Sequence, residues 1–113
     1  MDVNEAVSGL MQELRRGTLI MLALSELRTP MYGYDLVKRL EKAGVNMEAN
    51  TLYPLMRRLE GQGLLESRWE TGGSKPRKYY QLTPEGAFVL EKIKDYWKDF
   101  SHRISALLEE EKQ

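Results

Sequence analysis

Apolar residues recur at helical spacing in four segments of the chain, and the first segment covers residues 5–27. It contains a short apolar stripe followed by a denser one over residues 19–27, which we expect to be buried in the core. The short stripe consists of Leu10, Met11 and Leu14. Gly17 separates the two stripes and predicts a bend or a break. Pro30 cannot continue the helix, so the helix is expected to end before it.

The second and third segments predict two helices joined by a short turn. A helix over residues 33–43 is expected to end at Gly44, a residue favoured just after a helix. Asn46 is then the predicted N-cap of the next helix, with Glu48 in its first turn. The apolar side of the earlier helix is predicted to comprise Tyr34, Leu36, Val37 and Leu40. Two helices with this spacing predict a helix-turn-helix unit.

The third helix, over residues 50–61, has an unusual polar face. Its apolar stripe consists of Leu52, Leu55, Met56 and Leu59. The opposite side carries Asn50, Tyr53, Pro54 and Arg57, with Thr51 and Arg58 on its flanks. Amide, hydroxyl, phenol and guanidinium groups can all bond base edges or phosphates, although a surface helix that touches nothing is an alternative. Pro54 predicts either a bend or a helix that begins near Asn50.

Two strands are predicted over residues 64–70 and 78–82, joined through the glycine-containing tip Thr71-Gly72-Gly73-Ser74. Strand alternation places Trp69, Tyr79 and Tyr80 partly in the core and partly at the surface. A polar helix followed by a basic hairpin is typical of a winged helix-turn-helix protein that binds DNA.

The fourth helix is predicted from Thr83, as N-cap, to about Glu110, with Pro84 at its first position. Such a helix is about 40 Å long. Its apolar residues recur in a heptad pattern at Leu90, Ile93, Trp97, Phe100, Ile104 and Leu107. A domain this small cannot cover that seam, so we expect a second copy of the chain to do so, with Leu10, Met11 and Leu14 as additional surface. The alternative is that the helix folds back on its own domain.

The predicted fold class is therefore mainly α with a small β-hairpin, an α+β fold. Residues 1–82 would form a winged helix-turn-helix DNA-binding domain with an N-terminal helix, and residues 83–113 a C-terminal dimerisation helix, together one compact unit. The formal net charge is zero, yet residues 28–82 carry ten Lys/Arg against six Asp/Glu, a net charge of +4. The flanking segments are each −2, so the basic excess coincides with the helix and hairpin.

Composition argues against several other classes of protein. The chain has no cysteine, which excludes a disulfide framework or a thiolate metal site and fits a reducing cytoplasm. Its apolar runs are too short to cross a membrane, and the acidic N-terminus does not resemble a signal peptide. The single histidine, His102, is expected to be solvated or at an interface, and Gly72-Gly73-Ser74-Lys75 lacks the order of a phosphate loop. We therefore predict no catalytic residues, metal site or cofactor.

Several motifs resemble the PadR-like transcriptional regulators. They are Met31-Tyr32-Gly33-Tyr34-Asp35-Leu36, then Asn50-Thr51-Leu52-Tyr53-Pro54-Leu55-Met56-Arg57-Arg58-Leu59-Glu60, then Gly63-Leu64-Leu65, and finally Arg77-Lys78-Tyr79-Tyr80-Gln81-Leu82-Thr83-Pro84-Glu85-Gly86. The similarity runs from about residue 14 to residue 90, and the single C-terminal helix is similar to the small subfamily. One departure is Asn46-Met47-Glu48-Ala49, where the family usually has Ser or Pro.

The resemblance implies a homodimeric repressor whose third helix enters the major groove of double-stranded DNA, while the wing contacts the minor groove or the backbone. Base contacts would come from Asn50, Thr51, Tyr53 and Arg57. Phosphate contacts would come from Lys75, Arg77 and Lys78, together with the hydroxyl of Tyr32. Two copies would bind a pseudo-palindrome. A winged-helix module for protein partners is the alternative function, and the basic wing argues against it.

The resemblance also implies that a small aromatic ligand binds between the two long helices of a dimer. Trp97 stands where a tryptophan from each chain would stack on such an effector, and Phe100 and Leu14 would be its neighbours. The alternative is that Trp97 only packs the dimer seam.

Overall fold

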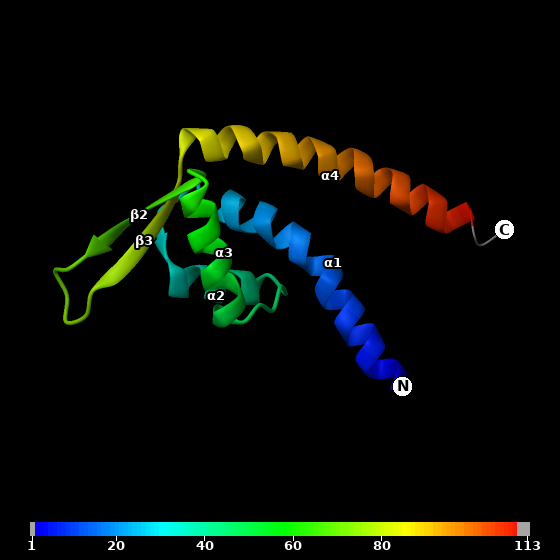
Figure 1. The fold of residues 1–113 in the computed structure, drawn as a ribbon, viewed down its shortest axis with the longest axis horizontal. Coiled ribbons are helices and arrows are strands. Elements are labelled where there is room, and N and C mark those ends of the chain that lie inside the picture. The colour runs from blue at the N-terminus through cyan, green and yellow to red at the C-terminus, as the bar shows by residue number, and fades with distance from the viewer. Residues whose placement is uncertain (1, 111–113) are drawn as a thin grey trace.

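The computed structural model describes residues 2–110 and contains four helices and three short strands. The helices are α1 (Val3–Glu26), α2 (Gly33–Lys42), α3 (Ala49–Gly61) and α4 (Pro84–Glu110). The strands are β1 (Met31–Tyr32), β2 (Leu65–Glu70) and β3 (Arg77–Leu82), in the sheet order β1-β3-β2. Three helices followed by a hairpin form a winged helix-turn-helix, with the β2–β3 hairpin as the wing (Figure 1).

A single core joins all the helices. Its members are Ala23, Leu24, Leu27, Leu36, Leu40, Leu52, Met56, Leu59, Leu65, Tyr80 and Leu90. The N-terminal part of α1 and the C-terminal part of α4 both extend beyond the other elements on the same side of the molecule (Figure 1). The radius of gyration is accordingly 16.8 Å, larger than the roughly 13 Å of a compact chain of about this length.

Both helices of the helix-turn-helix end in the same glycine motif. Gly44 and Gly63 have positive φ angles of 84° and 79°, a conformation that costs glycine little. After α2, Val45 N–H donates to the Leu40 carbonyl at 2.8 Å; after α3, Leu64 N–H donates to the Leu59 carbonyl at 3.0 Å. Each of these hydrogen bonds joins the N–H of one residue to the carbonyl five positions earlier, which is the pattern of a Schellman motif. The chain turns sharply after each helix.

The predicted third helix was placed correctly, but its cap was not. Helix α3 begins at Ala49, close to Asn50 as Pro54 suggested, and continues through Pro54. Its N-cap is Glu48, and Asn46 lies outside the helix. Val45 and Met47 are half-buried against the core while Asn46 and Glu48 are exposed, so the segment stays extended to direct alternate side chains inward.

One further expectation was wrong, and the sheet has an extra strand. Helix α1 is continuous through Gly17, so the bend or break predicted there is not a break, and Figure 1 shows that the axis of α1 changes direction along its length. Tyr34 was expected on the apolar side of α2, but it is 62% exposed because it lies on the side opposite Leu36. The buried residues of α2 are Gly33, Leu36 and Leu40. Strand β1 was not predicted, and it pairs with β3 through Met31–Tyr80 and Tyr32–Tyr79.

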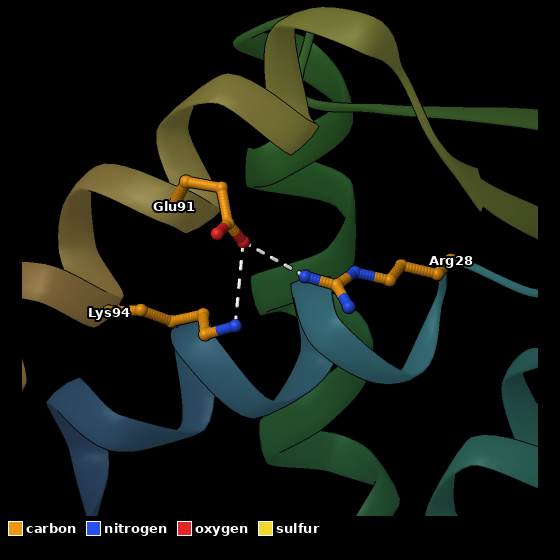
Figure 2. Close-up of polar contacts among 3 residues, drawn as sticks. All are labelled: Arg28, Glu91 and Lys94. Atoms are coloured by element: carbon orange, nitrogen blue, oxygen red, sulfur yellow. Dashed lines mark hydrogen bonds and ion pairs between the residues drawn. The ribbon is translucent and has the colours of Figure 1, made fainter.

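Contacts at the end of α1 fix the start of α4. Arg28 Nη2 lies 2.9 Å from Glu91 Oε2, which Lys94 Nζ also approaches at 3.4 Å (Figure 2). Leu82 N–H donates to the Leu27 carbonyl at 2.8 Å. Thr83 caps α4 as predicted, since its hydroxyl oxygen accepts from Gly86 N–H at 2.9 Å. The direction in which α4 leaves the core is therefore set by several polar contacts.

Candidate nucleic-acid interface

The outward side of α3 carries the polar residues that the sequence pointed to. Leu52, Met56 and Leu59 are buried beneath it. The exposed residues are Asn50, Thr51, Pro54, Arg57 and Arg58, whereas Tyr53 is half-buried. Helix α3 thus exposes amide, hydroxyl and guanidinium groups on one side, while its other side is packed in the core.

Tyr53 is held in place by α2. Its ring lies against Gly33, where an added β-carbon would come within 2.9 Å of the Tyr53 Cε1 atom. A larger residue at position 33 would require the Tyr53 ring to shift, so glycine lets the ring pack against the start of α2.

A hollow of about 520 Å³ lies between α3, the start of α2 and the wing. It is lined by Tyr32, Gly33, Tyr34, Asp35, Tyr53, Arg57, Arg77, Lys78 and Tyr80. Five of these were predicted to contact DNA, namely Tyr32, Tyr53, Arg57, Arg77 and Lys78. The other four, Gly33, Tyr34, Asp35 and Tyr80, were not predicted to contact DNA, although the first three directly follow Tyr32 in the sequence.

The remaining predicted residues lie around this hollow. Lys75 lines a smaller hollow of about 200 Å³ near the wing tip, together with Tyr32, Glu70 and Arg77. Thr51 lines two hollows on the other flank of α3, toward α1. Asn50 is exposed in the first turn of α3.

Aromatic and charged side chains hold the exposed side of the wing together. The Tyr32 and Tyr79 rings lie 4.0 Å apart, and the Arg77 guanidinium is 5.1 Å from the Tyr32 ring centre. The Tyr32 hydroxyl donates to Glu70 Oε1 at 2.8 Å. Tyr79 and Glu70 raise the pKa of Tyr32 well above its usual range, so the phenol remains a donor. A phosphate contact from Tyr32 would have to replace its contact with Glu70.

Lys78 is the most constrained cation of the wing. Its ammonium group lies 3.4 Å from Glu60 Oε1 on α3 and 5.2 Å from the Tyr80 ring centre. Glu60 also accepts a hydrogen bond from the Ser67 hydroxyl. Burial lowers the pKa of Lys78, but Tyr80 and Glu60 more than offset this, and the net shift is upward. Lys78 therefore joins β3 to the end of α3, whereas Lys75 and Arg77 are exposed.

The predicted dimer residues divide into two groups. Leu90 is fully buried in the chain's own core and has no surface to offer a partner, and Ile93 is half-buried there. The others are exposed in the single chain: Leu10, Leu14, Trp97, Phe100, Ile104 and Leu107. An open apolar surface therefore lies on the parts of α1 and α4 that extend beyond the core.

The residues that the structure describes were searched for clusters of metal-binding side chains and for membrane-spanning helices. Within residues 2–110, no group of three or more His, Cys, Asp or Glu side chains is arranged to hold a metal ion. In the same range, no helix is both long and apolar enough to cross a membrane.

Comparison with known proteins identifies the same arrangement elsewhere. Residues 20–92 match the model of the transcriptional regulator PadR-like family. The crystal structure of a PadR family regulator from Eggerthella lenta is 57% identical, with a TM-score of 0.90, and the match covers 95% of this chain and 96% of that one. Bacillus subtilis PadR, solved in complex with operator DNA, is 26% identical with a TM-score of 0.61, over 66% of this chain and 45% of that one.

A curated relative agrees over a shorter stretch. A transcriptional regulator of Mycobacterium tuberculosis is 35% identical over 60 residues, which is 53% of this chain. The matched segment spans 56% of that regulator's length.

Proposed function

This chain belongs to the PadR-like family of transcriptional regulators, and we propose that it is a cytoplasmic homodimeric repressor that binds a pseudo-palindromic operator. The observation that carries this proposal is the hollow between α3 and the wing, where Tyr53, Arg57 and Arg77 converge. The binding of operator DNA by the Bacillus subtilis relative supports it. In this arrangement the winged helix-turn-helix contacts DNA and α4 holds the dimer together, with help from the apolar stripe of α1. Residue 1 and residues 111–113 of the two predicted segments lie outside the described residues.

Each part of the interface has a distinct chemical task. Helix α3 enters the major groove, where Asn50, Thr51 and Arg57 reach base edges, with Tyr53 alongside. Lys75 and Arg77 neutralise phosphates from the wing, and their charge makes the affinity depend on salt. Lys78 helps mainly by holding β3 against α3 through Glu60. Two such units bind half-sites roughly one helical turn apart.

The exposed apolar residues of α1 and α4 support the homodimer. Leu14 is 77% exposed and Leu107 is 63% exposed in the single chain. Each such side chain contributes about 1.5–3 kcal/mol when fully buried. In a symmetric dimer both chains present the same surface to each other. The apolar residues of α1 and those of α4 can then be buried at a single interface.

The operator is tested by fluorescence anisotropy on DNA from upstream of the protein's own gene, at two salt concentrations, with a scrambled duplex as control. Tight, salt-sensitive binding that prefers the upstream duplex is expected. Equal, weak binding to both duplexes would direct the search to another operator or to a protein partner of the winged-helix module.

Replacing both Lys75 and Arg77 with alanine is expected to weaken DNA binding about tenfold and to reduce the slope of log affinity against log salt by roughly two. Both side chains are exposed, so the fold and the dimer should persist. Lys92→Ala on α4 removes an exposed cation away from the wing and serves as the control. An unchanged salt slope in the double variant would contradict the wing assignment.

Trp97 is proposed to stack on a flat aromatic effector in the dimer. It is 41% exposed in the single chain, with Phe100 one helical turn away. The chain has a second tryptophan, Trp69 on the wing, which is 64% exposed. In a Trp69→Phe variant, planar aromatic compounds should quench the remaining fluorescence and release bound DNA. Quenching without release would leave Trp97 as a ligand contact with no regulatory effect, and no quenching would leave it as a packing residue.

A further inference from the structure

Two adjoining hollows lie on the flank of α3 that faces α1, away from the wing. The larger, about 430 Å³, includes Arg15, Arg16 and Thr51 in its lining. The smaller, about 320 Å³, includes Arg16, Thr51, Pro54 and Arg58. Because Arg16, Leu19, Met47 and Thr51 line both, the two hollows form one groove between α1 and α3.

Helix α3 therefore lies between two grooves that contain arginine. Arg57 lines the hollow on the wing side, and the next residue, Arg58, lines the groove on the α1 side. Figure 1 shows the same order, with α3 between the wing and α1. Asn50 and Pro54 are exposed and, by helical spacing, lie between the two flanks of α3, with Pro54 at the edge of the groove toward α1.

DNA in contact with that ridge places a phosphate strand on each flank. An α-helix with its side chains is about 10–12 Å wide and fills a major groove about 12 Å wide. The two edges of the major groove are the two sugar–phosphate backbones. If the wing side receives one strand, the groove toward α1 faces the other.

Within the described part of the chain, the arginines of this groove form no ion pair with a carboxylate. Arg28, Arg39 and Arg103 each form an ion pair elsewhere in the structure. Among the ion pairs of residues 2–110, none involves Arg15, Arg16 or Arg58. Glu41 and Glu48 also line the groove, so its net charge is modest, and Glu48 is exposed beside the start of α3. Guanidinium groups bind phosphate oxygens in a bidentate manner that suits such a groove.

We infer that Arg15, Arg16 and Arg58 form a second phosphate-binding surface, which holds the DNA strand opposite the wing. This inference rests on the proposed DNA-binding function. Helix α1 would then bind DNA through one face and contact the partner chain of the dimer through another. The exposed apolar stripe at Leu10 and Leu14 lies on one face, and Arg16 lies on the opposite face with the buried Leu19.

The test compares the Arg15→Ala, Arg16→Ala double variant with the wild type on the operator and on the scrambled duplex, across a salt series. Affinity is expected to fall about tenfold on both duplexes, and the salt slope by about one to two. Glu48→Gln removes the opposing charge and is expected to tighten binding severalfold on both. Arg103→Ala, an arginine distant from α3, is the matched control, and sedimentation confirms that every variant remains a dimer.

The outcomes separate this inference from the proposed function. If the wild type binds neither duplex, the DNA-binding function itself fails. If the wild type binds, but the double variant has the affinity and salt slope of Arg103→Ala and Glu48→Gln has no effect, the second phosphate surface is wrong while the function stands. A loss of affinity confined to the operator would also overturn it, because phosphate contacts are independent of sequence.

Discussion

Substituting aspartate for Ile104 is expected to convert the proposed dimer to monomers and to weaken operator binding more than about a hundredfold. Ile104 lies in the open part of the heptad seam, between Phe100 and Leu107. An aspartate there has to lose its hydration on association and finds no cation in an apolar seam, so the dimer loses more than the isoleucine contact. A monomer then binds each half-site separately and forfeits the roughly 10²–10⁴-fold gain of linked binding.

The measurement is sedimentation equilibrium combined with anisotropy on the full operator and on a single half-site. His102→Asp is the control, since it adds the same side chain two residues away, on the other side of α4. It should remain a dimer with nearly normal affinity. If Ile104→Asp also remains a dimer, the open surface of α4 is not the interface, and the alternative that the helix folds back on its own domain regains support.

Local signals explain why much of the fold was predictable. Helix α4 runs from Pro84 to Glu110 as expected because its N-cap, first-position proline and apolar repeat all act over a few residues. The turn after α2 was likewise marked by Gly44, and Gly63 ends α3 in the same conformation. The wing strands followed from alternation and the glycines at the tip.

The features that escaped prediction depend on contacts between distant segments. Strand β1 has two residues, too few to show any alternation, and exists because it pairs with β3. The capping of α3 was misjudged because Met47 packs against the core, a tertiary effect that overrides the capping preference of Asn46. The tie between Lys78 and Glu60 spans 18 positions, so no local pattern indicates it. The groove containing Arg16 and Arg58 was missed for the same reason.

Replacing Gly86 with alanine is expected to destabilise the protein by about 3 kcal/mol, even though alanine ordinarily favours a helix by about 1 kcal/mol over glycine. Gly86 is buried in the first turn of α4, where a β-carbon would collide with the carbonyl oxygen of Leu64. That oxygen cannot move away easily, because Thr83 N–H donates to it at 3.1 Å and the Thr83 hydroxyl donates to the Gly63 carbonyl at 2.7 Å. The new methyl group would therefore force α4 away from the end of α3.

The matched control is Gly9→Ala in α1, where no atom outside the local helix lies within 4 Å of the added β-carbon. That variant should be neutral or more stable by up to about 1 kcal/mol. Urea denaturation at one fixed protein concentration compares the two, since the stability of a dimer depends on concentration. Equal stability of the two variants would mean that the contact between α4 and Leu64 is looser than the structure describes. A large difference would show that the close packing of α4 against the end of α3 contributes to stability, in addition to the contacts between α4 and the end of α1.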